Sequence, residues 1–495
     1  MRLRKLTITL MLIASLLIGA GGTYFGMSLF AASSGQGTSE GHRQIESEEN
    51  GGGKKAPEDN ESKVSFEKVK RAYELITKNY YKEVDGDELI NGAIQGMIDS
   101  LDDRFSVYMD PEAARQFTQS LSSSYQGIGA EVSMVNGIVT IMSPFKGSPA
   151  DKAGLRANDQ IISINGKSIT GLDLYEAVQK IRGKKGTTVT LGIKREGSDE
   201  IMKVKVTRGE IPIETVHKDT VKKDGKVYGI IQITSFSEGT ADEFHEALDA
   251  LESQGIAGLV IDVRGNPGGY LGSVTKIADE LIPNDEPIVQ VVDRNGNKKR
   301  YFSNLEEKKE YPIVGLINGG SASAAEILSG ALQEAGGYKL VGTKSFGKGT
   351  VQTEFNVGKG RLKLTIMKWL TPDGHWIHKK GLKPDISVKQ PEYFYAHPIT
   401  VEKGETLAYN ENNDKVKNAQ IMLEGLGFET GREDGYFGKQ TVTAVKAFQN
   451  ENGLSATGKI DKKTAKMLDQ KILQAVDKKK NDLQLQTALG YLENQ

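Results

Sequence analysis

Ser323 lies in a sequence context that could make a serine hydroxyl group a nucleophile. The mainly apolar residues Tyr311 to Ile317 predict a short strand, Asn318-Gly319-Gly320 breaks it, and a predicted helix runs from Ser321 to about Glu334. Such a strand–turn–helix junction holds a side chain at the rim of a sheet. The unpaired N–H groups at the start of the helix also favour developing negative charge. A plain helix cap, formed by Ser321 or Ser323, is the alternative interpretation of this segment.

A serine nucleophile needs a base, and the histidines do not supply an obvious one. The six histidines of the chain are His42, His217, His245, His375, His378 and His397. None of them lies in a recognisable triad context. His375 and His378 flank Trp376 in a predicted loop, where a two-histidine metal site would lack an obvious third ligand, so we interpret both as surface or packing residues. A Ser–His hydrolase that uses His217 or His245 is the weaker alternative.

Lys348 is the candidate base. An uncharged lysine can accept the serine proton, provided that burial lowers its pKa from about 10.4 by about three units. The segment from Gly342 to Lys348 also matches the spacing of a phosphate-binding loop. However, Gly349 stands where that loop has the Ser or Thr that holds magnesium, and residues Thr350 to Phe355 predict a strand in place of the required helix. We therefore favour a general base over a nucleotide site, with a solvated loop lysine as the ordinary alternative.

A second glycine-rich loop follows the predicted strand from Gly258 to Val263. Its sequence is Arg264-Gly265-Asn266-Pro267-Gly268-Gly269. Glycines allow backbone N–H groups to come close to a substrate carbonyl group, because no side chain stands in the way. The alternative for this segment is an ordinary tight turn.

Taken together, these segments resemble the carboxyl-terminal processing protease family, also called tail-specific proteases. The resemblance covers residues 65–388 and rests on the loop 264–269, the turn 318–324 and the segment Phe346-Gly347-Lys348-Gly349-Thr350-Val351-Gln352. The order of these motifs and the 25-residue step from Ser323 to Lys348 are as the family has them. The resemblance implies a serine endopeptidase that needs no metal or cofactor.

The resemblance also assigns roles to individual residues. Ser323 would be the nucleophile, Lys348 the general base, and Gln352 the residue that orients the lysine. The backbone N–H groups of Ala324 and of Gly269 or Gly268 would form the oxyanion hole. Many members have another serine at the position of Ala325, but that position is not the nucleophile. A catalytically silent scaffold is the alternative function, although such a protein need not keep both Ser323 and Lys348.

A peptide-binding domain is expected between residues 122 and 206. The segments Ser148–Leu155 and Asp159–Gly166 resemble a PDZ domain, which the family carries inside the protease. The loop of Gly127, Ile128, Gly129 and Ala130 precedes a predicted strand, so its N–H groups could bind a terminal carboxylate while the strand edge pairs with an extended peptide. We expect this domain to select free C-terminal tails and to gate the active site.

The C-terminal part resembles a small three-helix peptidoglycan-binding domain. The matching pieces are Val416–Leu423, Asp434–Gly438, Thr441, Ala444-Val445, Phe448-Gln449, Gly453-Leu454 and Gly458. Most of the apolar residues among them are expected to form the core of the module. The resemblance implies peptidoglycan as a partner and a location at a bacterial cell wall.

The N-terminus and the composition indicate where the protein works. Arg2, Arg4 and Lys5 precede a mainly apolar run of about 27 residues from Leu6 to Ala32, which is long enough to span a membrane. An uncleaved anchor is favoured over a cleaved signal, and either leaves the rest of the chain outside the cell membrane. The chain has no cysteine and a net charge of −1, which excludes disulfides and gives no reason to expect nucleic acid as a partner.

The chain has 495 residues, which is too long for one hydrophobic core. Several domains must therefore position the candidate catalytic and binding residues. We predict a multidomain α/β protein: a mixed-sheet protease core, an inserted PDZ domain, a helical N-terminal arm and a small three-helix C-terminal domain. The expected limits are anchor or signal 1–32, disordered linker 33–63, helical N-terminal part of the protease 64–121, PDZ domain 122–206, protease core 207–395, linker 396–413, peptidoglycan-binding domain 414–470 and helical tail 471–495. The helical arms at both ends could form a homodimer, and the expected substrates are proteins with accessible C-termini.

Overall fold

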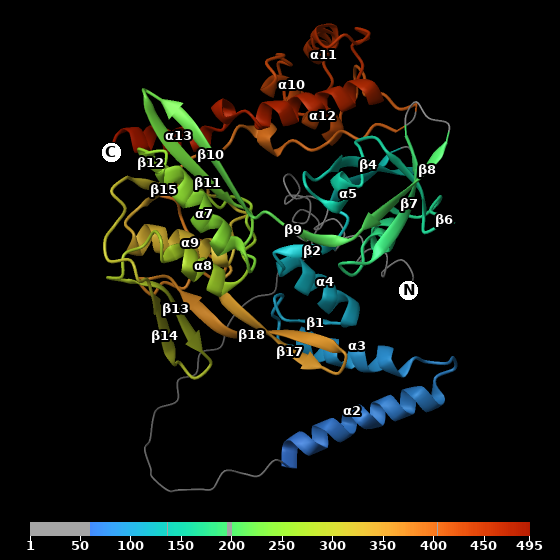
Figure 1. Ribbon diagram of the computed structural model, residues 1–495, viewed down its shortest axis with the longest axis vertical. Helices are drawn as coiled ribbons and strands as arrows, with labels where there is room; N and C mark the ends of the chain where they lie inside the picture. Colours follow the sequence, from blue (N-terminus) through green and yellow to red (C-terminus); the bar gives the residue numbers. More distant parts are fainter. Residues whose placement is uncertain (1–59, 136, 196–199, 403) are drawn as a thin grey trace, which may run out of the picture.

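The computed structural model describes residues 60–495, except 136, 196–199 and 403 (Figure 1). The predicted anchor or signal and most of the predicted linker therefore lie outside the described residues. Within the described part, no helix has both the length and the apolar character that a membrane crossing requires.

A six-stranded sheet with the strand order β10-β11-β12-β15-β16-β19 forms the centre of the protease part. Its strands are β10 (Val216–Lys223), β11 (Lys226–Ile233), β12 (Gly258–Asp262), β15 (Ile313–Ile317), β16 (Lys339–Gly342) and β19 (Ile386–Ser387). β10 runs antiparallel to β11, and the remaining neighbours are parallel. β15 is apolar along its whole length, and β12 up to Asp262, because both faces of the sheet are buried there.

Helices cover the two faces of this sheet. Ile261 and Ile317 belong to one core cluster with the helices α7 (Thr240–Glu252), α8 (Leu271–Ala278) and α9 (Ala324–Gly330). Val260 and Leu316 alternate with them and pack on the other face against α13 (Leu483–Glu493). The last helix of the chain is thus part of the protease core, and Figure 1 shows it near β12 and β15.

A second sheet, of five strands, extends the protease part. Its members are β1 (Val107–Met109), β18 (Gly360–Leu370), β13 (Pro287–Asp293) and β14 (Lys298–Phe302), in that order, with β17 (Thr350–Val357) also paired to β18. β1 belongs to the N-terminal part, which also contains α2 (Asn60–Asn79), α3 (Gly86–Asp99) and α4 (Pro111–Leu121). The pairing of β1 with β18 brings the N-terminal part to the strands that follow Lys348.

The inserted domain is joined to the rest of the chain by two short strands, β2 (Ser124–Gly127) and β9 (Gly209–Pro212), which pair with each other. Its own sheet has the order β3-β4-β5-β7-β8, with β6 paired to β5. Its elements are β3 (Ala130–Val135), β4 (Ile138–Pro144), α5 (Pro149–Lys152), β5 (Gln160–Ile164), β6 (Lys167–Ser168), α6 (Leu174–Ile181), β7 (Thr188–Lys194) and β8 (Ile201–Thr207). β3 is one of the two edge strands of this sheet, so one side of it is open for pairing.

The C-terminal module consists of α10 (Asp414–Gly425), α11 (Lys439–Glu451) and α12 (Lys462–Val476), which share a core of their own. Short 3-10 turns, Glu392–Tyr395 and Lys479–Asn481, flank it. The observed architecture is therefore the predicted one, a mixed α/β protease core with an inserted small domain, a helical N-terminal part and a three-helix module.

Candidate active site

Ser323 occupies the predicted junction between a strand and a helix. It follows β15 and is the residue directly before α9, with φ 55° and ψ −114°. A non-glycine residue in this left-handed region is strained by about 1–3 kcal/mol, and such strain is concentrated at functional positions. The Ser321 hydroxyl donates to the carbonyl oxygen of Val263 at 2.8 Å and accepts from the N–H of Asn318 at 3.0 Å. Ser321 therefore ties the turn together, whereas Ser323 stands at the end of the sheet.

A buried carboxylate joins the two candidate catalytic segments. Glu326 Oε2 accepts the backbone N–H of Ser323 at 3.0 Å and that of Lys348 at 2.8 Å. Its Oε1 accepts the Ser345 hydroxyl at 2.5 Å and the Gly347 N–H at 2.7 Å. The side chain of Glu326 is fully buried, and burial raises its pKa, while these four hydrogen bonds partly counter the rise. Glu326 thus fixes the backbone of Ser323 relative to that of Lys348.

Lys348 lies in an environment that favours the uncharged amine. Burial lowers its pKa to about 8, and the nearby Lys363 acts in the same direction, whereas Asp103 and Glu326 partly oppose the shift. The loop that carries Lys348 continues into β17, as predicted, and not into the helix that a phosphate-binding loop requires. A lysine of this kind can act as a general base near neutral pH.

Phe105, from the segment between α3 and β1, covers the lysine. Lys348 Nζ lies 5.1 Å from the centre of the Phe105 ring. The His378 ring meets the edge of Phe105 with 6.0 Å between ring centres, and the Arg104 guanidinium lies 4.9 Å from the centre of the Phe105 ring. The N-terminal part of the chain therefore contributes the aromatic ring that covers the Lys348 side chain.

Two of the predicted side-chain relationships do not appear in the structure. Among the described residues, no hydrogen bond joins Ser323 Oγ to Lys348 Nζ. Gln352 donates through its amide to the hydroxyls of Thr350 and Thr365, both at 3.0 Å, and not to Lys348. The predicted catalytic side chains thus lie on neighbouring segments, and their roles stay predictions.

The loop 264–269 lies against Ser323. A Cβ atom on Gly268 would come within 2.8 Å of Ser323 Cβ, and one on Gly269, whose φ is 151°, within 2.0 Å of the Phe236 carbonyl oxygen. The Gly268 N–H already donates to Asn266 Oδ1 at 2.8 Å. In the described part of the chain, the N–H groups of Gly269 and Ala324 donate no such bond. Of the two glycines that the resemblance offered, Gly269 is therefore the one whose N–H fits the predicted oxyanion role.

Asn318 and two buried ion pairs of Arg264 hold this loop. Asn318 Oδ1 accepts the N–H of Gly265 and that of Gly320, both at 2.9 Å, and so joins the two turns. The Arg264 guanidinium bonds Asp262 at 2.6 Å and Asp482 at 2.8 Å, and both acidic side chains are mostly buried. Asp482 caps the start of α13, so the C-terminal helix is linked directly to the predicted oxyanion loop.

The predicted carboxylate-binding loop is located where a peptide could reach an open strand edge. Gly127 ends β2, and Ala130 begins the edge strand β3. The side chain of Ile128 is buried in the core of the inserted domain, and the Gly129 carbonyl oxygen accepts the Ser148 hydroxyl at 2.7 Å. Gly129 has a φ of 73°, and a Cβ there would lie 2.5 Å from that of Ser148, so a glycine is required. The backbone groups of this loop can contact a ligand, whereas the buried side chain of Ile128 cannot.

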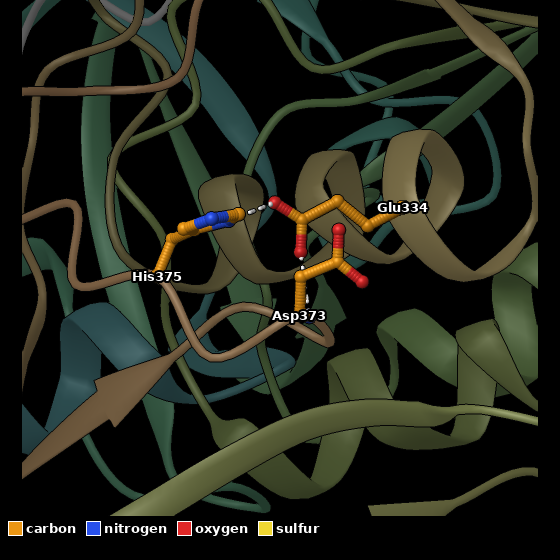
Figure 2. Close-up of side chains that lie close together, drawn as sticks. All are labelled: Glu334, Asp373 and His375. Atoms are coloured by element: carbon orange, nitrogen blue, oxygen red, sulfur yellow. Dashed lines mark hydrogen bonds and ion pairs between the residues drawn. The ribbon is translucent and has the colours of Figure 1, made fainter.

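The histidines of the loop after β18 have separate surroundings. His378 stacks on Trp376 with ring centres 5.3 Å apart, and its Nδ1 accepts the Gly349 N–H at 3.3 Å. Figure 2 shows that His375 instead points toward Glu334, at 3.1 Å, with Asp373 beside them. Ligand-type atoms of Glu334, Asp373 and His375 lie within 4.8 Å of one another, so these are the described residues that could hold a metal ion. Two of the three are exposed, and Glu334 Oε2 already accepts the Asp373 N–H at 2.8 Å.

Sequence reasoning missed Glu326 and Phe105. A glutamate three residues after a serine at a helix start is the usual signature of a capping box, which could have identified Glu326 as a partner of the Ser323 backbone. Its bonds to the loop of Lys348 depend on tertiary structure. Phe105 carries no local signal, because it is more than 200 residues away from Lys348 in the sequence.

Sequence comparison with protein families divides the chain in a similar way. The family described as "Peptidase family S41" matches residues 227–388, and a PDZ domain matches 126–206. An "Activating protease CtpB N-terminal domain" matches residues 16–113, and a "Putative peptidoglycan binding domain" matches 412–468.

Individual proteins match over most of their length. The carboxy-terminal processing protease CtpB of Bacillus subtilis (strain 168) is 53% identical over 438 residues, which cover 88% of this chain and 91% of CtpB. CtpA of the same organism is 42% identical, with 90% and 93% covered. A solved structure, a photosystem II D1 C-terminal processing protease, is 27% identical, covers 66% of this chain and 87% of its own, and has a TM-score of 0.41.

The fold and the comparisons agree with the family that the motifs indicated. The matched regions contain the strand–turn–helix junction of Ser323, the loop of Lys348, the inserted domain and the three-helix module. The chain is a serine-type peptidase and belongs to the carboxy-terminal processing protease family.

Proposed function

We propose that this peptidase is a Ser–Lys endopeptidase that cleaves extracytoplasmic proteins and recognises their free C-terminal tails through its PDZ domain. Ser323 is the nucleophile and Lys348 the general base. The observation that carries the proposal is the Glu326 carboxylate, which binds the backbone N–H groups of both residues. A lysine whose pKa burial lowers to about 8 fits the role of base.

In the first chemical step, uncharged Lys348 accepts the proton of the Ser323 hydroxyl as its oxygen attacks the peptide carbonyl carbon. Catalytic hydrogen bonds are often long or misaligned until a substrate is bound. The proposal therefore requires Lys348 Nζ to move from the Phe105 ring toward Ser323 Oγ on peptide binding. The protonated lysine then returns its proton to the leaving amine, and water hydrolyses the acyl-enzyme.

The negative charge on the carbonyl oxygen is stabilised by the backbone N–H groups of Ala324 and Gly269. Ala324 is the first residue of α9, where N–H groups have no partner within the helix. Removing one such donor in other hydrolases costs about 10²–10³ in kcat, so these groups are a large part of catalysis. Gln352 orients Lys348 only if its amide leaves the hydroxyls of Thr350 and Thr365, to which it now donates.

The test of the dyad is cleavage of an unstructured peptide, with the products identified by mass spectrometry. Ser323→Ala and Lys348→Ala should each abolish cleavage while the circular dichroism spectrum stays that of the wild type. Lys348→Arg should be equally inactive, because an arginine stays charged. The exposed Lys344 of the same loop is the matched control, and Lys344→Ala should remain active. Activity retained in Lys348→Ala but lost in His217→Ala or His245→Ala would contradict the proposal.

Tail recognition is supported by the open edge of β3 and by the loop 127–130 that precedes it. A peptide that adds to this edge places its terminal carboxylate near the loop. Two peptides of identical sequence, one with a free and one with an amidated C-terminus, test this directly. The free peptide should be cleaved with the higher kcat/KM, and deletion of residues 122–206 should remove the difference. Equal cleavage of both peptides by the intact chain would contradict tail recognition.

The proposed location rests on the predicted roles of the two ends of the chain. We propose that residues 1–32 anchor the protein in the cell membrane, or export it as a signal, and that the C-terminal module binds peptidoglycan. The exposed apolar residues Phe66 and Ile76 of α2, and Tyr80 directly after it, support a homodimer formed through the N-terminal arm. Protease treatment of intact cells should degrade the catalytic part, and light scattering of the purified chain should give twice the mass of the monomer.

A further inference from the structure

The three-helix module contains a surface cavity whose position no sequence motif indicated. Its volume is about 260 Å³, and it is lined by Tyr409, Thr430, Arg432, Tyr436, Gly438, Lys439 and Gln440. These residues come from the segments before α10 and between α10 and α11, and from the first residues of α11. Figure 1 shows α11 at the outer end of the module, away from the protease sheet, so this part of the molecule faces outward.

One wall of the cavity is aromatic and is held in place by its neighbours. The Tyr436 hydroxyl donates to Asn410 Oδ1 at 3.0 Å, and the Arg432 guanidinium lies 4.7 Å from the centre of the Tyr436 ring. Arg432 is itself fixed by Asp434, whose carboxylate accepts from Nε at 2.7 Å. Tyr409 is 52% exposed, although it is a large aromatic side chain next to these groups. Rigid, partly exposed tyrosines offer flat apolar surface and a hydroxyl group together.

The charged residues that line the cavity, Arg432 and Lys439, are both positive. Arg432 and Asp434 balance each other, but Lys439 forms no ion pair with any described residue. Glu424, an acidic side chain behind the cavity wall, is turned inward and accepts the N–H and the hydroxyl of Thr430 at 2.6 and 2.8 Å. One uncompensated ammonium group beside two aromatic rings therefore faces the solvent, which suits a ligand that has both a carboxylate and an apolar ring face or methyl groups.

We propose that this cavity is the peptidoglycan contact of the module, and that it binds a muropeptide. The carboxylate of the stem peptide pairs with Lys439, and the sugar ring or its acetyl and lactyl methyl groups lie on Tyr409 and Tyr436. This inference rests on the proposed binding of peptidoglycan by the module, and it adds the side chains and the ligand chemistry. Thr430 is buried and already bonded to Glu424, so the exposed Gln440 supplies the amide that can bond the amides and hydroxyls of the ligand.

Gly438 provides a test that separates charge from fold. It is the N-cap of α11, its φ of −81° is accessible to any residue, and a Cβ there would lie 3.7 Å from Arg432 Cδ. Asparagine and aspartate are both good N-caps and have nearly the same shape. Gly438→Asn and Gly438→Asp should therefore fold equally well, but only aspartate places a negative charge in the cavity.

The experiment measures the binding of the full-length chain to a purified disaccharide–tetrapeptide and to cell-wall sacculi stripped of teichoic acids. Gly438→Asp and Lys439→Gln should each bind about tenfold more weakly, whereas Gly438→Asn stays within about threefold of the wild type. Tyr409→Ala should also weaken binding. Lys462, the exposed first residue of α12, is the matched control, and Lys462→Gln should bind like the wild type. Peptide cleavage should be unchanged in all of these variants.

The outcomes distinguish this inference from the function on which it rests. If the wild type binds stripped sacculi but Gly438→Asp and Lys439→Gln bind equally well, the cavity is not the site, although wall binding stands. If the wild type binds neither the muropeptide nor stripped sacculi, the proposed cavity site and the proposed peptidoglycan binding of the module are both wrong. If binding to sacculi requires teichoic acids, the Lys439 ammonium group binds a phosphate polymer. That result would contradict the proposal that the cavity binds a muropeptide. A muropeptide with amidated carboxyl groups should bind more weakly than the free acid, and equal affinity would exclude the proposed pairing with Lys439.

Discussion

Ser323 and Lys348, which are 25 positions apart in the chain, donate their backbone N–H groups to one and the same oxygen atom, Oε2 of Glu326. A single buried carboxylate thus holds the turn before α9 and the loop before β17 at a fixed separation. The other oxygen of this carboxylate, Oε1, accepts from Ser345 and Gly347. A side chain with fewer acceptor atoms at position 326 would therefore leave buried donors unpaired.

Glu326→Gln should therefore reduce both catalysis and stability. The amide nitrogen of glutamine would face two N–H or O–H donors, and each unpaired buried donor costs about 1–3 kcal/mol. We expect kcat to fall at least about tenfold with KM little changed, since the backbone of the dyad shifts while the peptide site is untouched. The measurements are peptide kinetics and thermal unfolding, with Glu334→Gln as a control outside this network. Unchanged kcat in Glu326→Gln would show that the carboxylate does not position the dyad.

Activity should rise with pH, because the proposed base works in its uncharged form. Burial lowers the pKa of Lys348 to about 8. Below that value the uncharged fraction falls about tenfold per pH unit, so kcat/KM should rise about tenfold between pH 6 and pH 7 and level off above about pH 9. A histidine base would instead give a midpoint near about 6.5. A flat profile from pH 6 to 9 would count against the lysine.

Phe105 should control that midpoint. Its ring keeps water from Lys348, and burial is the main cause of the lowered pKa of the lysine. Phe105→Ala admits water and should move the midpoint of the kcat/KM profile toward the ordinary lysine value, so that activity at pH 7 falls severalfold. Phe105→Leu keeps most of the apolar surface and should have a nearly normal midpoint. Identical profiles for the alanine variant and the wild type would mean that other residues set the pKa.

Asp482→Asn should weaken the attachment of α13 to the loop of Arg264. Hydrogen bonds to charged groups contribute about 1.5–3 kcal/mol, and Arg264 keeps its other partner, Asp262, so we expect a loss of about 2 kcal/mol in the free energy of unfolding at pH 7. The exposed Asp477 provides the control, and Asp477→Asn should have little effect.

The ion pair between Arg264 and Asp482 should also make the stability of the protein sensitive to acid. Burial alone would raise the pKa of Asp482, but the Arg264 guanidinium and the hydrogen bonds outweigh it, so the pKa lies below its ordinary value of 3.8. The contribution of Asp482 is then complete above pH 3.8 and is lost as the pH falls through the lower value of the folded state. Urea unfolding at pH 7 and at a series of pH values below 3.8 should show a difference between wild type and Asp482→Asn that is full at pH 7 and shrinks as the pH falls. A constant difference would indicate lost packing, not lost charge.

The sequence alone was sufficient for the family, the fold class and the positions of the candidate dyad. These predictions rested on local motifs and on their resemblance to known families: the apolar run before Asn318-Gly319-Gly320, the glycines around Lys348, and the matching pieces of the C-terminal module. Backbone geometry at such positions depends on nearby residues, so a glycine with positive φ or a strand–turn–helix junction can be recognised without coordinates.

Tertiary structure decided the environment of these groups. The polar segment 471–495 was expected to be a tail, yet Leu485, Leu489 and Leu492 of α13 are buried on the protease sheet. The cover that Phe105 provides for Lys348, and the bond between Arg264 and Asp482, join residues more than 200 positions apart. Burial and electrostatics depend on which distant segments meet in space, and no local pattern contains that information. The pKa of a lysine therefore follows from the folded chain, whereas the position of that lysine can be predicted from the sequence.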